Sequence, residues 1–158
     1  MRGKRAKKRI WEPDPLYNSP LLTRLINRVM KDGKKSLAQK LVYRALERVK
    51  KETGKDPLSV FQKAVENVKP RMEVRPRRVG GAAYLVPLPV RGERRTSLAI
   101  RWLVLSARDR PNKEYHTFDQ KLAAELIAAS RGEGGAVEKK HQVHRLAEAN
   151  KAFAHFRW

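Results

Sequence analysis

Residues 69–95, KPRMEVRPRRVGGAAYLVPLPVRGERR, alternate apolar and polar side chains on both sides of a Gly-Gly pair. Alternation with a period of two is typical of a half-buried β-strand. Because glycine adopts positive φ without steric cost, Gly80-Gly81 predicts a tight hairpin turn. The apolar positions are Met72 and Val74 before the turn and Tyr84, Val86, Leu88 and Val90 after it. The stretch therefore predicts a two-stranded β-hairpin arm at about residues 71–90.

The apolar residues of both strands are expected on one face of this arm, with Glu73, Arg75 and Arg77 on the opposite face. Pro87 and Pro89 lack the N–H that a strand donates. Residues two apart share the same bonding parity, so both prolines can face outward on an edge. The pattern fits an ordinary surface hairpin or a basic arm that binds nucleic acid.

The composition indicates a single domain with a polyanionic partner. The 158 residues include 37 Lys and Arg against 16 Asp and Glu, a formal net charge of +21. Self-repulsion on this scale favours a polyanion, with nucleic acid as the leading candidate. No apolar run approaches the roughly 20 residues that span a bilayer, so no membrane association is expected. The absence of cysteine excludes disulfides and thiolate metal sites. With no secretory signal pattern at the N-terminus, we expect a cytoplasmic protein.

The N-terminal segment predicts a basic tail. Its cations are Arg2, Lys4, Arg5, Lys7, Lys8 and Arg9. Such a segment cannot bury apolar surface, so it is expected to be disordered until it binds RNA. A merely solubilising tail is the alternative. We place the tail at residues 1–16 and a single helical domain at residues 17–158.

Six helices are predicted from apolar residues at helical spacing and from cap and stop signals. They run from Ser19-Pro20 to Gly33, from about Leu37 to Gly54, from Asp56-Pro57 to Pro70, from Thr96 or Ser97 to Pro111, from Thr117 to Gly132, and from Ala136 to about Phe156. In the second of these, Leu37 is expected to face inward. The fold class is therefore mainly α: a six-helix domain with a protruding two-stranded β-hairpin arm and a disordered basic N-terminal tail.

Motifs for catalysis or metal binding are weak. The DGKKS segment at 32–36 lacks the glycine spacing of a nucleotide-binding loop, although Lys34 and Lys35 at a helix start favour phosphate of any kind. His141 and His144 share a helix face, but the surrounding cations disfavour a metal ion. There is no nucleophile motif and no carboxylate cluster for paired magnesium ions. The sequence predicts a binding protein with no enzymatic activity, no cofactor and no metal.

Four segments carry a family resemblance: INRVMKDGKKSLAQKLVY, AVENVKPRMEVRPRRVGGAAYLVPLPV, SLAIRWL and HRLAEANKAFAHFRW. Together they closely resemble the bacterial-type small-subunit ribosomal protein seven family, from about Tyr17 to Trp158. The resemblance implies a six-helix domain with an extended hairpin and a location in the ribosome, bacterial or organellar. It also implies a primary ribosomal RNA binder that nucleates assembly of the subunit head. Its arm and C-terminal region would approach the messenger and the exit-site transfer RNA, beside ribosomal proteins nine and eleven.

The same resemblance implies three sets of site residues, and no homo-oligomer is expected. The positions facing ribosomal RNA are Arg2, Lys4, Arg5, Lys7, Lys8, Arg9, Lys34, Lys35, Arg71, Arg75, Arg77, Arg78, Arg94, Arg95, Arg101, Arg108 and Arg110. Those facing transfer and messenger RNA are Arg77, Arg78, Val79, Gly80, Gly81, Ala82, Ala83 and Tyr84. Those facing protein partners are His144, Asn150, Phe153, His155, Phe156 and Trp158. The segment NKEYHTFDQ, residues 112–120, departs from the family pattern, being longer and less basic.

Two other classes compete with this interpretation. An architectural DNA-binding protein could project the Arg-rich ribbon into a minor groove, with Pro76 wedging a base step. An RNA-modifying enzyme would require a cofactor pocket that the sequence does not indicate.

Overall fold

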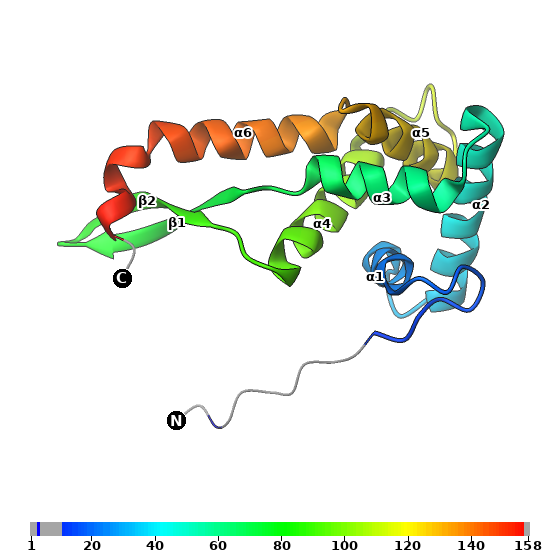
Figure 1. Ribbon diagram of the computed structural model, residues 1–158, viewed down its shortest axis with the longest axis horizontal. Helices are drawn as coiled ribbons and strands as arrows, with labels where there is room; N and C mark the ends of the chain where they lie inside the picture. Colours follow the sequence, from blue (N-terminus) through cyan, green and yellow to red (C-terminus); the bar gives the residue numbers. More distant parts are fainter. Residues whose placement is uncertain (1–2, 4–10, 157–158) are drawn as a thin grey trace.

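The computed structural model describes Gly3 and residues 11–156 of the chain, shown in Figure 1. The predicted tail positions among residues 1–2 and 4–10, together with Trp158, lie outside the described residues. The elements are α1 (Pro20–Val29), α2 (Lys35–Thr53), α3 (Pro57–Val68), β1 (Met72–Val79), β2 (Ala82–Pro89), α4 (Glu93–Asp109), α5 (Phe118–Arg131), α6 (Gly135–Ala149) and the 3-10 helix η1 (Lys151–Phe156). The mainly helical class with one β-hairpin is confirmed.

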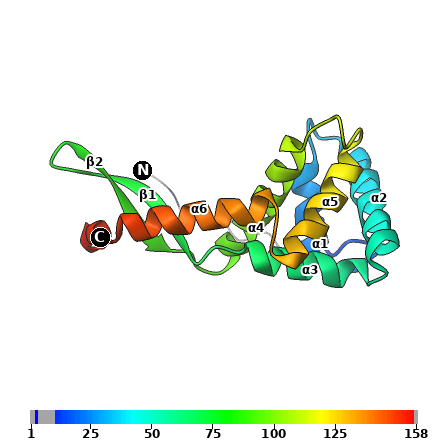
Figure 2. The same ribbon diagram turned by 90° about the horizontal axis from the view of Figure 1, so that it is seen from above.

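The helices α1 to α5 form a body at one end of an elongated molecule, and the hairpin and α6 extend from it side by side (Figures 1 and 2). Helix α5 packs against α2, α3 and α4, so it lies at the centre of the body. The largest fully buried side chains come from all five helices. They include Phe61, Leu22, Leu25, Leu46, Leu103, Leu122 and Leu126. No helix in the described part of the chain is both long and apolar enough to cross a membrane.

Side-chain caps are present at three of the predicted helix starts. The Ser19 side chain accepts a hydrogen bond from the backbone N–H of Leu22, and the Asp56 side chain accepts one from that of Ser59. Thr117 and Gln120 form a reciprocal capping box at α5. Each such cap is worth about 1 kcal/mol, which explains why these boundaries are readable from local sequence.

Three predicted helix boundaries are wrong. Helix α1 ends at Val29, with Met30 as its C-cap, and does not continue to Gly33. Helix α4 begins at Glu93 rather than near Thr96 or Ser97, because Gly92 at φ 50° reverses the chain and starts the helix earlier. The last helix does not run unbroken to Phe156. It ends at Ala149, where the backbone and side-chain N–H groups of Asn150 both donate to the carbonyl of Leu146, and η1 follows.

Asp14 joins the segment before α1 to the body. It is buried, and its carboxylate accepts hydrogen bonds from the Tyr43 hydroxyl of α2 (2.8 Å) and from the N–H groups of Leu16 and Tyr17. The chain is therefore already packed against α2 within the stretch that the sequence assigns to the tail.

The hairpin turn is confirmed at Gly80-Gly81, with φ values of 57° and 91°. Val79 pairs with Ala82, so the loop has two residues, and two consecutive positive φ values are typical of a type I′ turn. The N–H of Val90 donates to the carbonyl of Arg71 at 3.0 Å. Hydrogen-bonded and non-bonded pairs alternate from there, so Pro89, Pro87 and Pro76 all fall at pairs that need no ladder donor.

The predicted faces of the arm are wrong. Cross-strand partners share a face, and the register pairs Glu73 with Leu88, Arg75 with Val86, and Arg77 with Tyr84. A two-residue turn between Val79 and Ala82 sets odd-numbered residues of β1 opposite even-numbered residues of β2. Glu73, Arg75 and Arg77 therefore lie on the same face as Tyr84, Val86 and Leu88, and not on the opposite face as predicted.

Helix α6 and η1 cover the arm instead of leaving it bare. The backbone N–H of Arg71 donates to the His144 Nε2 atom of α6 at 2.9 Å. The Tyr84 ring of β2 lies 5.1 Å from the Phe153 ring and 5.5 Å from the Phe156 ring of η1. These contacts cover part of a hairpin that would otherwise expose both of its faces, although most of its residues stay exposed or half-buried.

Candidate nucleic-acid interface

Three arginines from two neighbouring helices gather on one side of the body. Burial lowers the pKa of the Arg28 guanidinium on α1, and the positive charges of Arg101 and Arg108 on α4 lower it further. Among the described residues, none of the three forms an ion pair with a carboxylate. Neighbouring cations without a carboxylate partner repel one another, and a phosphate bound between them offsets that repulsion. We call Arg28, Arg101 and Arg108 the arginine cluster.

The surface beside the arginine cluster includes residues that the sequence interpretation missed. Arg24 on α1 donates to the carbonyl of Glu93 and to the Ser97 hydroxyl of α4, which ties the two helices together. Trp11 is 42% exposed and lines shallow hollows with Arg24 and Arg28. The spacing of Arg24 and Arg28, four residues apart and off the apolar stripe of α1, is the signal that could have identified them.

Lys34 and Lys35, predicted as RNA-facing, are exposed where α2 begins. Lys34 is the N-cap residue, and no side chain caps this helix start. Together with the exposed Lys31, these lysines place three cations in the connection from α1 to α2. The positive surface thus continues from α1 and α4 to the start of α2.

Several predicted RNA-facing arginines are engaged within the chain. Buried Glu73 accepts a hydrogen bond from Arg75 Nε (2.7 Å) and another from Arg94 Nε (2.8 Å), which fixes β1 to the start of α4. Arg95 donates to the carbonyl of Pro70 at 3.1 Å. The side chains of Arg75 and Arg94 remain 48% and 52% exposed, so each can also reach an external phosphate.

Arg110 has a more enclosed role. Its Nε donates to the buried Glu125 carboxylate at 2.9 Å, and its Nη1 donates to the Tyr115 hydroxyl at 3.3 Å. Its guanidinium also lies 5.4 Å from the centre of the Tyr115 ring. Tyr115 belongs to the atypical segment 112–120, which therefore helps to position Arg110. The Lys121 ammonium also donates a hydrogen bond to the backbone carbonyl of Arg110.

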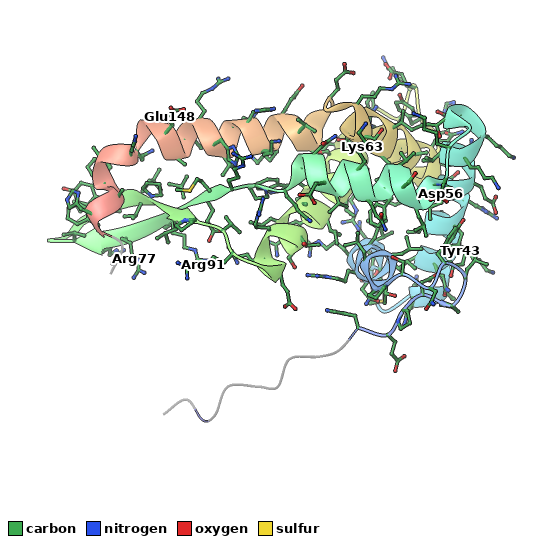
Figure 3. The ribbon with its side chains drawn as sticks, in the orientation of Figure 1. Tyr43, Asp56, Lys63, Arg77, Arg91 and Glu148 are labelled. Atoms are coloured by element: carbon green, nitrogen blue, oxygen red, sulfur yellow. The ribbon has the colours of Figure 1, made fainter. Side chains whose placement is uncertain are left out.

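The arm carries exposed cations at its base and near its tip. Arg71, Arg77 and Arg78 are exposed and form no ion pair within the described part of the chain. Figure 3 places Arg77 of β1, and Arg91 of the segment that follows β2, along the edge turned away from α6. Glu148 lies on α6 itself. This edge of the arm therefore offers positive charge to an external partner.

The structure brings together the tip and the C-terminal region, which were predicted as separate sites. Phe153 and Phe156 pack against Tyr84, so the tyrosine ring is occupied within the chain and is not free for base stacking. His155 lies 4.0 Å from the Phe156 ring, and its Nδ1 contacts the carbonyl of Ala152. We call Tyr84, Phe153 and Phe156 the aromatic clamp.

His144, one of the two histidines that share a face of α6, makes a contact within the chain. The described residues contain no group of three His, Asp or Glu side chains placed to hold a metal ion. His144 instead accepts the Arg71 N–H, which requires an unprotonated Nε2. Its role is to hold α6 against the base of the arm.

The stability of the protein is expected to fall as the pH drops below about 6.5. Burial, followed by the charges of Lys140, His141 and Arg71, lowers the pKa of His144 from its ordinary value of 6.5. A base whose pKa is lowered by folding stabilises the native state above pH 6.5. This stabilisation is lost as the pH falls from 6.5 toward the lowered pKa of the folded state. Urea unfolding between about pH 7.5 and pH 5 measures the effect.

A His144→Gln variant should show a flatter dependence of stability on pH over that range. The exposed His116→Gln variant is the matched control and should follow the wild type. Identical pH profiles for the wild type and His144→Gln would contradict the assignment.

Comparison with known proteins places this geometry in a family. Residues 1–151 match the family described as ribosomal protein S7p/S5e. The protein named small ribosomal subunit protein uS7 from Carboxydothermus hydrogenoformans is 59% identical over 146 residues, which cover 92% of each chain. The protein of the same name from Thermotoga maritima is 57% identical over 161 aligned residues, covering both chains completely. That from Pseudothermotoga lettingae is 54% identical over 158 residues, again across both whole chains.

Proposed function

This chain belongs to the ribosomal protein S7p/S5e family, and from that premise we propose that it is a primary binder of small-subunit ribosomal RNA that nucleates assembly of the subunit head. As a member of the family it is a structural component of the small ribosomal subunit and not an enzyme. The family membership also leaves the architectural DNA-binding alternative without support.

The observation that carries the proposal is the arginine cluster. Burial lowers the pKa of Arg28, the neighbouring charges of Arg101 and Arg108 lower it further, and among the described residues no carboxylate pairs with these three arginines. Arginine forks onto phosphate oxygens with two parallel hydrogen bonds, so the group fits a folded RNA backbone. Binding energy from many such phosphate contacts is what an early, tightly bound assembly protein requires.

The arm and its covering segment support the second part of the proposal, an approach to exit-site transfer RNA and messenger RNA. Exposed Arg77 and Arg78 stand next to the Gly80-Gly81 turn, at the far end of the molecule from the body (Figure 1). The aromatic clamp fixes this end, so the cations are presented from a braced structure. A braced tip is suited to probing a neighbouring RNA, whereas the arginine cluster anchors the body.

For protein partners, we infer contact through α6 and η1 with ribosomal proteins nine and eleven. Leu146 on α6 is 50% exposed, and an apolar side chain on a surface helix gains from being covered. His144, Asn150, Phe153 and Phe156 make contacts within the chain, so they position this surface as much as they form it.

Replacing both Arg28 and Arg101 with Gln is expected to weaken binding to isolated head-domain RNA about tenfold at moderate salt. It should also reduce the slope of log K against log salt by about 1.4 to 1.8, since each phosphate neutralised contributes about 0.7 to 0.9. Filter binding across a salt series measures both quantities.

The control variant combines Lys63→Gln with Arg131→Gln, which removes the same charge from α3 and the end of α5, away from α1 in Figure 1. It should leave the slope close to that of the wild type. Equal losses in the two double variants would show that net charge, and not the arginine cluster, sets the affinity.

A further inference from the structure

A hollow of about 530 Å³ lies between the start of α2, the end of α1, α4 and α5. We call it the notch. Its apolar wall includes Leu37 and Leu41 of α2 and Phe118 of α5. Leu37 was expected to face inward, and this is wrong: it lies in the first turn of α2, is 53% exposed and lines the notch. A volume of this order falls within the roughly 300–1,000 Å³ typical of sites for small organic groups.

The rim of the notch is positively charged. Lys31, Lys34 and Arg108 line it, and Asp32 is the one acidic residue among the lining residues. Arg108 uses one of its five N–H donors on the carbonyl of Val29 (3.1 Å), so further donors remain. Three cations around an apolar wall fit a ligand that carries both a flat apolar part and a phosphate.

The notch is continuous with the surface already assigned to RNA. Arg108 belongs to both the arginine cluster and the rim, so an RNA backbone held by Arg28 and Arg101 passes directly beside the notch. Proteins that recognise RNA commonly take bases out of the stack and hold them against apolar, aromatic or arginine surfaces. The carboxylate of Asp32 can accept a hydrogen bond from a base amino group or a ribose 2′-hydroxyl, whereas it repels phosphate.

We propose that the notch holds one unstacked nucleotide of the bound small-subunit RNA. Its base lies against Leu37, Leu41 and Phe118, and its phosphate lies among Lys31, Lys34 and Arg108. This inference rests on the proposed function as an RNA binder and adds a base-binding subsite to it. An apolar base contact releases no counterions, so it contributes affinity without contributing to the salt slope.

The test uses the full chain and a head-domain transcript of small-subunit RNA in filter binding across a salt series. Leu37→Ala is expected to weaken binding about five- to tenfold with an unchanged salt slope. Leu37→Asn, which keeps the branched shape but loses the apolar surface, should do the same, whereas Leu37→Met should bind like the wild type. Leu105→Ala removes a comparably exposed leucine from α4 and is the matched control, with no loss expected.

Dimethyl sulfate probing of the same complexes identifies the nucleotide. At least one base should change its reactivity when the wild type binds and should not change when Leu37→Ala binds. If both Leu37→Ala and Leu37→Asn bound the transcript with wild-type affinity, the proposal that the notch holds a nucleotide would be overturned, while the proposed function would stay intact. A wild-type chain that bound the head-domain transcript no better than an unrelated RNA of equal length would overturn the proposed function itself. Thermal unfolding of each variant shows whether the fold is retained, as the exposure of Leu37 leads us to expect.

Discussion

Replacing Glu125 with Ala is expected to lower the free energy of unfolding by about 3–5 kcal/mol. Glu125 is 1% exposed in the centre of α5. One carboxylate oxygen accepts from Arg110 Nε and the other accepts from the backbone N–H of Ala136 at the start of α6, both at 2.9 Å. Its removal leaves a mostly buried guanidinium without its counter-charge and a buried N–H without an acceptor, and each loss is costly.

Urea unfolding compares this variant with two others. Glu125→Gln keeps an oxygen that can accept from Ala136 but loses the charge opposite Arg110, so it should be destabilised by an intermediate amount. Glu133→Ala removes an exposed acid from the turn between α5 and α6 and should change stability by less than about 0.5 kcal/mol. If Glu125→Ala proved as stable as Glu133→Ala, Glu125 would not be what joins α4, α5 and α6.

Replacing both Phe153 and Phe156 with Ala is expected to loosen the tip of the arm while leaving the body intact. The two rings cover Tyr84 at centroid distances of 5.1 Å and 5.5 Å. Losing two partly buried rings and their aromatic contacts costs the arm about 2–3 kcal/mol of local stability. Amide hydrogen exchange in residues 77–84 should therefore accelerate roughly a hundredfold.

Hydrogen exchange measured by mass spectrometry separates the arm from the body. Amides near Phe61 and Leu126 should keep their wild-type protection, because the cores of α3 and α5 do not touch η1. The control Leu146→Ala removes an exposed apolar side chain from α6 and should leave the tip protected. Unchanged exchange at the tip, or equal acceleration throughout the body, would contradict the bracing role of the aromatic clamp.

Local chemistry alone determined the helices, the hairpin and its turn. Ser19, Asp56 and the Thr117–Gln120 pair act on N–H groups within three residues, and Gly80-Gly81 acts on its own backbone angles. All the residues that take part in such short-range interactions are neighbours in the sequence, so the interactions can be predicted without knowledge of the fold. The motifs between about Tyr17 and Trp158 were likewise sufficient for the family, and the comparisons confirm it.

Only the tertiary structure decided which charged side chains are free. Glu73 and Arg94 are 21 residues apart, and Arg71 and His144 are 73 apart, so no local pattern reveals that they meet. The same holds for the arginine cluster, which forms because α1 and α4 pack side by side, and for Leu37, which stays 53% exposed although it continues the apolar spacing of α2. Long-range contacts are set by how whole helix faces pack, and this packing determines which arginines neutralise acids and which are left to bind phosphate.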